Sequence, residues 1–325
     1  MAETALERRF LAAIEGLHAR HRDPEAFVAA GELADQLGRS PEAFLYFSRA
    51  LEEDPSLKPR LLSRLRLTAR PEDRERLDKL AARPSNFEEA IRGVWKWPWR
   101  SWGTGVLIMG GIVVYGLRFL FGMLGGIAGM AGPIASSVMV AYLFAFLLKI
   151  VRDAATGEDD VLYWPDIGGG DALFKAFFLF YFAMVAAFGP ALAASIGLPR
   201  SGILPEAPPL RGALVFLLAL AGAMYFPIGL LATAVYDRFL IAFRYPRLIA
   251  SIVRGGRPYV RCVLLAWVCL GGLAVATALG QWPWTFYSIG PVLVVLELYF
   301  WAVFMRTVGL FYRYERKRLA WPMEP

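Results

Sequence analysis

The sequence predicts an all-α fold, in which a small N-terminal cytoplasmic helical domain precedes a polytopic bundle of six transmembrane helices. Two observations support this prediction. Hydrophobic residues make up 57% of the 325 residues, and charged residues only 19%. The charges are also unevenly placed, because residues 1–100 contain 18 Lys and Arg and 17 Asp and Glu, whereas residues 101–325 contain 17 and 11. The first part therefore has the composition of a soluble domain, and the second that of a membrane domain.

The cytoplasmic domain, residues 1–84, shows helical periodicity from its start. Apolar residues recur at helical spacing at Leu6, Phe10, Leu11, Ile14 and Leu17. Pro24–Leu37 and Pro41–Glu53 are then predicted as two helices, with Ser40 as the N-cap of the second. A further helical segment is expected at residues 58–82.

The unit Pro24–Leu57 resembles a tetratricopeptide repeat. The positions of the repeat pattern are filled by Phe27, Gly31, Ala43, Phe47, Ala50 and Pro55, while Ala34 departs from the usual tyrosine. The resemblance implies close packing of two helices and a peptide-binding groove beside Phe27, Gly31 and Phe47. The alternative is a small packing domain, because one repeat cannot bury its own face and the helices at 5–19 and 58–82 would cap it.

Residues 85–101 are predicted to form an amphipathic juxtamembrane helix. Ser85-Asn86-Phe87-Glu88 has the pattern of a capping box, and the helix is expected to run to about Trp97. The segment around it mixes aromatic and basic residues, namely Trp95, Lys96, Trp97, Trp99, Arg100 and Trp102. Such a mixture is typical of the membrane–water interface.

Six apolar segments in the membrane domain, residues 102–310, are long enough to cross about 30 Å of hydrocarbon. They are approximately 103–123, 129–150, 173–197, 212–235, 259–280 and 288–309, with a glycine-rich turn near Gly125 and Gly126 between the first two. Lys and Arg concentrate in alternate connections, and the fifth connection has none. The positive-inside rule therefore places both termini in the cytoplasm. The bundle is expected to lie in the cell (inner) membrane.

Glu297 is the most prominent polar residue of the spans, because it lies near the middle of the last one. A carboxylate at that depth must be neutral, paired or facing a cavity. Arg118, near the outer end of the first span, is the nearest partner by depth. The two residues are predicted either to form a structural pair or to serve a function, in which Glu297 relays a proton or binds a cationic group.

Two basic segments adjoin the later spans. The fourth connection, residues 236–258, mixes apolar residues with arginines, and Pro246 is expected to break it. It is predicted to lie at the interface with its arginines on lipid phosphates. The residues expected to contact anionic lipid headgroups are Arg244, Arg247, Arg254 and Arg257, together with Arg313 and Arg316 near the basic cytoplasmic tail, residues 311–325.

The sequence gives little support for a metal site. The second connection, from Gly157 to Asp171, contains several carboxylates but does not match the spacing of an EF-hand, so a turn-rich loop with an interfacial Trp164 is favoured. His18 and His21 are the only histidines, and no Cys or further His completes a site around them. The two cysteines lie in one apolar span and are predicted to be packing residues.

Residues 86–322 resemble an uncharacterised family of bacterial and archaeal multi-pass membrane proteins, known as a domain of unknown function. The resemblance rests on Tyr142–Asp166, on Tyr245–Ile249 and on Gly309–Trp321. The chain departs from the pattern at Leu162-Tyr163, where a proline is expected, and before Pro246, where an asparagine is expected. The resemblance implies the membrane architecture and carries no activity.

No HExxH, Walker or nucleophile-elbow motif occurs in a suitable context, so the sequence predicts a non-enzymatic protein without a cofactor. The basic residues flank apolar spans, which favours anionic lipid over nucleic acid as a partner. The first functional hypothesis is a membrane-anchored scaffold that engages a cytoplasmic protein through residues 1–84. The alternative is a small-solute or lipid transporter, or a lipid-handling protein, that uses a cavity near Glu297. Whether Glu297 faces a cavity separates the two.

Overall fold

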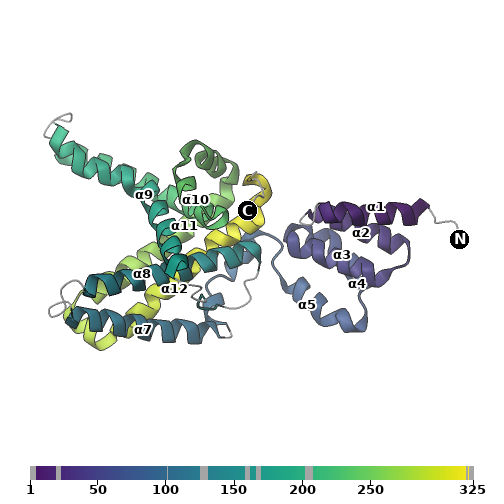
Figure 1. Ribbon diagram of the computed structural model, residues 1–325, viewed down its shortest axis with the longest axis horizontal. Helices are drawn as coiled ribbons and strands as arrows, with labels where there is room; N and C mark the ends of the chain where they lie inside the picture. The colour runs from purple at the N-terminus through teal and green to yellow at the C-terminus, as the bar shows by residue number, and fades with distance from the viewer. Residues whose placement is uncertain are drawn as a thin grey trace. The chain divides into compact units, whose positions relative to one another are not determined.

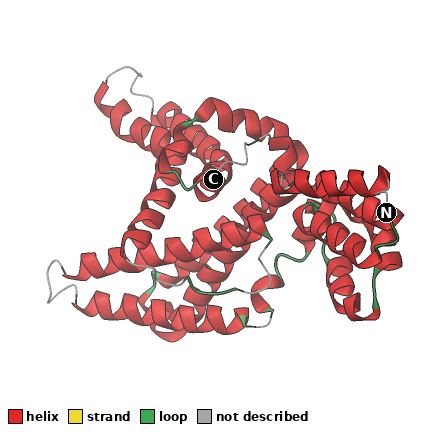
Figure 2. Ribbon diagram, turned by 45° about the vertical axis from the view of Figure 1, so that its right-hand side comes forward, coloured by secondary structure: helices red, strands yellow, loops and turns green. Residues whose placement is uncertain are grey.

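The computed structural model describes residues 5–19, 23–100, 102–124, 131–157, 162–165, 170–201, 208–319 and 321. All regular secondary structure within these ranges is helical, as Figure 2 shows. The prediction of an all-α fold is therefore confirmed for the described residues. The chain divides into two compact units, Met1–Ala90 and Ile91–Pro325.

Among its described residues, the first unit contains α1 (Ala5–Ala19), α2 (Pro24–Gln36), α3 (Ser40–Glu53), α4 (Lys58–Thr68), α5 (Arg74–Ala82) and the start of the short helix at Phe87–Arg92 (Figure 1). Its core includes Phe10, Val28, Phe47 and Leu61, none of which is more than 1% exposed. The helix expected at 58–82 is two helices, because the chain turns extended at Ala69 and Pro71 opens a short 3₁₀ segment.

Local capping differs in part from the prediction. Asp23 caps α2 by accepting a hydrogen bond from the backbone N–H of Glu25 at 3.1 Å. Ser40 is not the cap of α3, because the helix already begins at Ser40 and Arg39 occupies the cap position without a side-chain bond. Both helices have a proline in the first turn, where the backbone N–H groups have no partner within the helix and the missing N–H of proline therefore costs no hydrogen bond.

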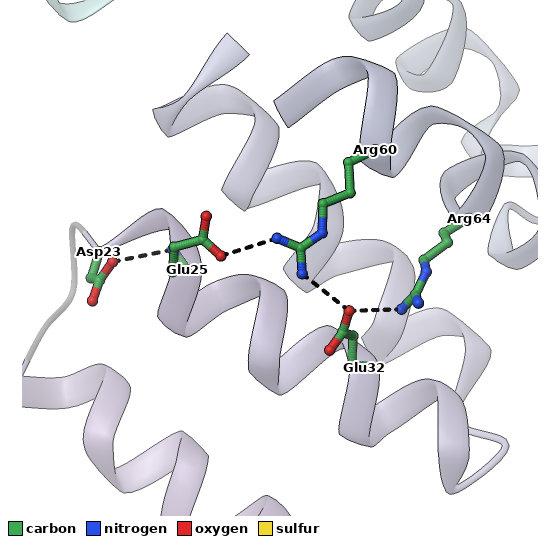
Figure 3. A network of polar contacts seen from close by, with 5 residues as sticks. All are labelled: Asp23, Glu25, Glu32, Arg60 and Arg64. Carbon is green, nitrogen blue, oxygen red and sulfur yellow. Dashed lines mark hydrogen bonds and ion pairs between the residues drawn. The ribbon is translucent and has the colours of Figure 1, made fainter. Parts of the chain in front are cut away.

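The close helix approach expected between α2 and α3 is present at Gly31. A Cβ at this position would lie 2.6 Å from Cε1 of Phe47, so only glycine leaves room for the ring. Ion pairs also join α4 to α2, as Figure 3 shows: Arg60 lies 3.3 Å from Glu25 and 3.4 Å from Glu32, and Arg64 lies 3.0 Å from Glu32. Because these pairs are partly exposed, they orient the two helices more than they stabilise the unit.

The predicted juxtamembrane helix is shorter than expected. It is α6 (Phe87–Arg92), followed by turns and a 3₁₀ segment at Trp97–Trp99. Its cap is Asn86 and not Ser85, because Asn86 Oδ1 accepts a hydrogen bond from the backbone N–H of Glu89 at 2.9 Å. Glu89 in turn accepts a hydrogen bond from the backbone N–H of Ser85 at 2.8 Å.

The described residues of the second unit form six long helices: α7 (Gly103–Leu124), α8 (Ala131–Thr156), α9 (Gly170–Ser201), α10 (Pro208–Tyr236), α11 (Tyr245–Gly280) and α12 (Pro283–Leu319). Among the described residues, five of them are long and apolar enough to cross a membrane: α7, α9, α10, α11 and α12. The predicted span 129–150 corresponds to α8, and the side chains at its start lie outside the described residues. The turn near Gly125 and Gly126 also lies outside them.

Helix α12 is central to the second unit, because it packs against α7, α8 and α11. Glycines permit the closest approaches. A Cβ at Gly111 of α7 would lie 2.3 Å from Val295 Cγ2, and one at Gly309 of α12 would lie 2.5 Å from the backbone oxygen of Val151. Small residues at such crossings let membrane helices approach closely enough for their backbones to make contact.

The fourth connection is broken at a different residue from the one expected. Pro246 lies in the first turn of α11, where its missing N–H costs nothing. The break is at Gly256, whose φ of 52° and ψ of −135° interrupt α11 and divide it into a short first segment and a long second one. A positive φ is readily adopted only by glycine, which explains the residue type at this kink.

Candidate functional site

The structure brings Arg118 of α7 and Glu297 of α12 together as an ion pair. Arg118 Nη1 donates to Glu297 Oε2 at 2.8 Å, and the hydroxyl of Thr277 on α11 donates to Glu297 Oε1 at 3.3 Å. Both carboxylate oxygens therefore have a partner. The Glu297 side chain is 11% exposed and that of Arg118 is 40% exposed, so the carboxylate is the more deeply buried member.

The ion pair lines a cavity of about 180 Å³ between α7, α8 and α12. The remaining walls are apolar and include Val114, Leu143 and Trp301. A guanidinium carries five N–H donors in a fixed plane, so Arg118 presents hydrogen-bonding capacity to this cavity as well as to Glu297. Glu297 thus lies at a cavity, as the hypothesis of a transporter or lipid-handling protein requires and the scaffold hypothesis does not.

A larger apolar cleft of about 630 Å³ adjoins this cavity, and the two share Val114 and Leu143 as lining residues. It lies between α7 and α8, two helices that run side by side in Figure 1. Among its lining residues are Met109, Val113, Leu117, Val138, Met139 and Leu173. Met109, Val113 and Val138 are at least half exposed, so the cleft opens to the outer surface of the helices.

Trp164 forms one wall of the cleft, although its segment was expected to be an interfacial loop. The ring stacks on Tyr142 and Phe146 of α8, with ring centroids 5.5 and 4.3 Å apart. On the other side it packs against α7 so closely that a Cβ at Gly110 would lie 2.2 Å from Trp164 Cζ2. The described residues Leu162–Pro165 therefore turn back between α7 and α8. A glycine on α7 facing a tryptophan in a distant loop was not recognisable from the sequence.

Four of the predicted headgroup contacts are exposed and the other two are not. Arg244, Arg247, Arg254 and Arg257 are exposed on and beside the first part of α11. Arg313 is 9% exposed, and its guanidinium lies so close to Gly157 that a Cβ there would be 2.7 Å from Cζ. Arg313 is therefore largely buried in the bundle and its headgroup contact stays a prediction, while Arg316 is only half-exposed.

The predicted basic tail is an extension of the bundle. Helix α12 continues to Leu319, which is 0% exposed, and Trp321 donates from its indole N–H to Ser251 Oγ at 2.8 Å. The helix continues past residue 310, and Phe311 packs against Gly255 and Tyr259 of α11. Residue 320 and residues 322–325 lie outside the described residues.

The predicted partner groove in the first unit is filled. Phe47 is 0% exposed, Gly31 is buried beneath its ring, and Phe27 is half-buried against the same core. The Arg64 guanidinium also lies over the Phe47 ring, 5.8 Å from its centroid. These residues therefore stabilise the unit and offer no open groove, while protein binding by residues 1–84 elsewhere on their surface stays a prediction.

The described residues contain no group of three or more His, Cys, Asp or Glu side chains placed to hold a metal ion. Several carboxylates of the second connection lie outside the described residues, as do His21 and the side chain of His18. Cys262 and Cys269 are both buried, as expected for packing residues.

The fold defines a multi-pass integral membrane protein, because five helices among the described residues are long and apolar enough to cross a membrane. Within it, the Arg118–Glu297 ion pair lies beside an apolar cleft. Comparison with protein-family models, with curated proteins and with solved structures finds no match.

Proposed function

We propose that the protein is a lipid-handling membrane protein that holds a lipid chain in the cleft between α7 and α8. The observation that carries the proposal is the apolar cleft itself, which shares the lining residues Val114 and Leu143 with the cavity at Arg118 and Glu297. A volume of about 630 Å³ is within the range of about 300–1,000 Å³ that small-molecule sites have. The walls are apolar and the opening faces lipid, so a hydrocarbon chain is the ligand that such a cleft favours.

The topology supports a lipid bound from the cytoplasmic leaflet. We propose six crossings, with α8 as the sixth, and both termini in the cytoplasm, because the cation-rich connections alternate along the chain. With this orientation, α7 begins and α8 ends at the cytoplasmic side. Trp164 then reaches the cleft from the cytoplasmic side, and Arg118 lies toward the outer side of the same space.

We also propose that the first part of α11 lies on the membrane surface. Leu248 and Ser251 are buried against the protein, whereas Ile249 and Val253 are 51% and 75% exposed. Exposed arginines, including Arg247 and Arg254, lie on the same segment. Exposed apolar residues beside arginines are the pattern of an interfacial helix that inserts its apolar side and places its cations at anionic phosphates.

The test is lipid retention by the full-length protein. The protein is purified in a mild detergent, and the lipid that stays bound after exhaustive washing is quantified by mass spectrometry. Val138→Phe places a ring in the cleft at a half-exposed position, and we expect it to remove most of the retained lipid.

Val268→Phe is the matched control, because Val268 is 59% exposed on α11 and does not line the cleft. It should retain lipid like the unchanged protein. Equal retention by both variants, or no retained lipid in the unchanged protein, would contradict the proposal.

A further inference from the structure

A second, polar cavity of about 280 Å³ adjoins the cytoplasmic end of the apolar cleft. It lies between α8 and α9, and it shares Tyr142 and Leu173 with the cleft. Its polar lining comes from Lys149, Arg152 and Asp153 at the end of α8. The cavity therefore joins a charged end to an apolar channel, as the headgroup and the chains of a lipid require.

The charges around this cavity form two linked groups. Lys149 Nζ lies 2.6 Å from Asp153 Oδ2. Arg152 donates to Asp237 Oδ1 at 2.7 Å and to the backbone oxygen of Ala234 at 2.9 Å, and Lys175 of α9 pairs with the other oxygen of Asp237. Asp237, the residue directly after α10, has a φ of 53°, a conformation that non-glycine residues rarely adopt.

Among the described residues of the two groups, three cations face two carboxylates, which leaves one net positive charge. Arg152 and Lys175 are tied to Asp237 on another helix. Lys149, by contrast, pairs with Asp153 one turn further along its own helix, and its side chain is 34% exposed. Lys149 is therefore the cation that can turn to a ligand without separating two helices.

The length of the site matches one leaflet. Lys149 lies eleven residues after Val138 on α8, a rise of about 16 Å. One leaflet supplies about 15 Å of the roughly 30 Å hydrocarbon core. Val138 lines the apolar cleft and Lys149 lines the polar cavity, so the combined site extends from the headgroup level to about the middle of the bilayer.

Aromatic residues mark the boundary between the two parts. The hydroxyl of Tyr142 donates to the backbone oxygen of Pro165 at 3.4 Å, and the Tyr142 ring stacks on Trp164. Rings with one apolar and one polar end suit the level at which a lipid changes from chains to headgroup.

We propose that this polar cavity binds the headgroup of a glycerophospholipid with a single negative charge and a hydroxyl donor, the class to which phosphatidylglycerol belongs. The inference rests on the proposed function, because the acyl chains would occupy the cleft. The phosphate accepts hydrogen bonds from Lys149 and neutralises the net positive charge. The headgroup hydroxyl donates to Asp153, which replaces the contact that Lys149 gives up.

The test compares lipids that differ only in the headgroup. The delipidated full-length protein is titrated with phosphatidylglycerol, phosphatidylethanolamine and phosphatidylcholine of identical chains, and binding is read by native mass spectrometry. We expect phosphatidylglycerol to bind about tenfold more tightly than phosphatidylcholine, because the cationic choline adds a positive charge beside the cations of the cavity and has no hydroxyl to donate to Asp153. Lys149→Gln removes the net positive charge and should remove most of this preference. It should also weaken phosphatidylcholine binding, because both lipids carry the phosphate that Lys149 contacts.

Two variants serve as controls. Lys149→Arg keeps the charge and should keep the preference. Lys96→Gln makes the same substitution at an exposed lysine that does not line the cavity, and it should have no effect. The comparison of lipids on the unchanged protein needs no variant, so misfolding of Lys149→Gln would not remove the test.

The outcomes separate the two proposals. If all three lipids bind equally and Val138→Phe still abolishes binding, the headgroup assignment is wrong and the cleft assignment stands. If phosphatidylethanolamine binds more tightly than phosphatidylglycerol, the assignment to a singly charged anionic headgroup is overturned. If no lipid binds, or Val138→Phe binds normally, the proposed function itself fails.

Discussion

Removing either member of the Arg118–Glu297 pair should destabilise the membrane unit, and by unequal amounts. Arg118→Leu leaves Glu297 without its cation, and Glu297→Leu leaves Arg118 without its anion. The carboxylate side chain is 11% exposed, whereas the guanidinium side chain is 40% exposed and reaches a cavity. The buried Glu297 carboxylate that Arg118→Leu leaves unpaired with a cation therefore costs more stability than the partly exposed Arg118 that Glu297→Leu leaves behind.

The magnitude follows from the geometry of the pair. At 2.8 Å and an effective dielectric constant of about 20, the Coulomb attraction is about 6 kcal/mol, and the desolvation of both ions opposes much of it. Orphaning one buried ion costs about 3–5 kcal/mol. We expect this cost for Arg118→Leu, and about 1–2 kcal/mol for Glu297→Leu because Arg118 is partly exposed.

The measurement is thermal unfolding of the full-length protein in detergent, followed by circular dichroism. For a unit of this size, 1 kcal/mol corresponds to roughly 2–4 °C in Tm, so Arg118→Leu should lower Tm by about 10 °C. The double variant Arg118→Leu/Glu297→Leu should recover much of the loss, since it leaves no orphaned ion. If the two single effects are equal and add in the double variant, the two residues do not interact and the reasoning is refuted.

Two further predictions concern packing and topology. Gly309→Val should lower the free energy of unfolding by about 1–3 kcal/mol, because the new side chain would meet the Val151 backbone oxygen. The control Gly271→Val has open space around it and should change the free energy of unfolding little. Thermal unfolding compares the two variants, and equal effects would contradict the close approach of α8 and α12. Tags at the two termini should be protected from a protease added outside intact cells and cleaved once the membrane is opened, whereas cleavage of either tag in intact cells would contradict the proposed orientation.

The sequence predicted the helices well because hydrophobic periodicity and length determine them. Apolar runs marked α7 and α9–α12, and the positions of Pro24 and Pro41 marked the starts of α2 and α3. The contact between Arg118 and Glu297 was also foreseeable, since a carboxylate near the middle of a span needs a partner and few cations lie at a suitable depth.

Features that depend on tertiary contacts were not predictable in the same way. Arg313 lies among aromatic and basic residues in the sequence, as interfacial residues do. Its burial depends on where the end of α8 lies, which the local sequence does not indicate. Trp164 similarly looked interfacial, because nothing in its own segment indicates that Gly110 leaves a space for its ring. The kink at Gly256 was assigned to Pro246, since proline is the stronger helix breaker except in the first turn, where Pro246 lies.

In the proposed lipid site, the two polar groups beside the cleft would have separable roles. Arg118 and Glu297 connect α7 to α12, whereas Lys149 lies about 16 Å along α8 from Val138, at the end proposed to be cytoplasmic. Under this proposal, a lipid chain that ends near the bilayer middle brings no charge to the ion pair, so the pair would stabilise the wall of the site and would not select the headgroup. The salt bridge of Lys149 lies within one helix, so Lys149 would select the headgroup and contribute little to stability. Arg118→Leu should therefore lower Tm without changing the preference for phosphatidylglycerol. Lys149→Gln should reduce the preference for phosphatidylglycerol without lowering Tm.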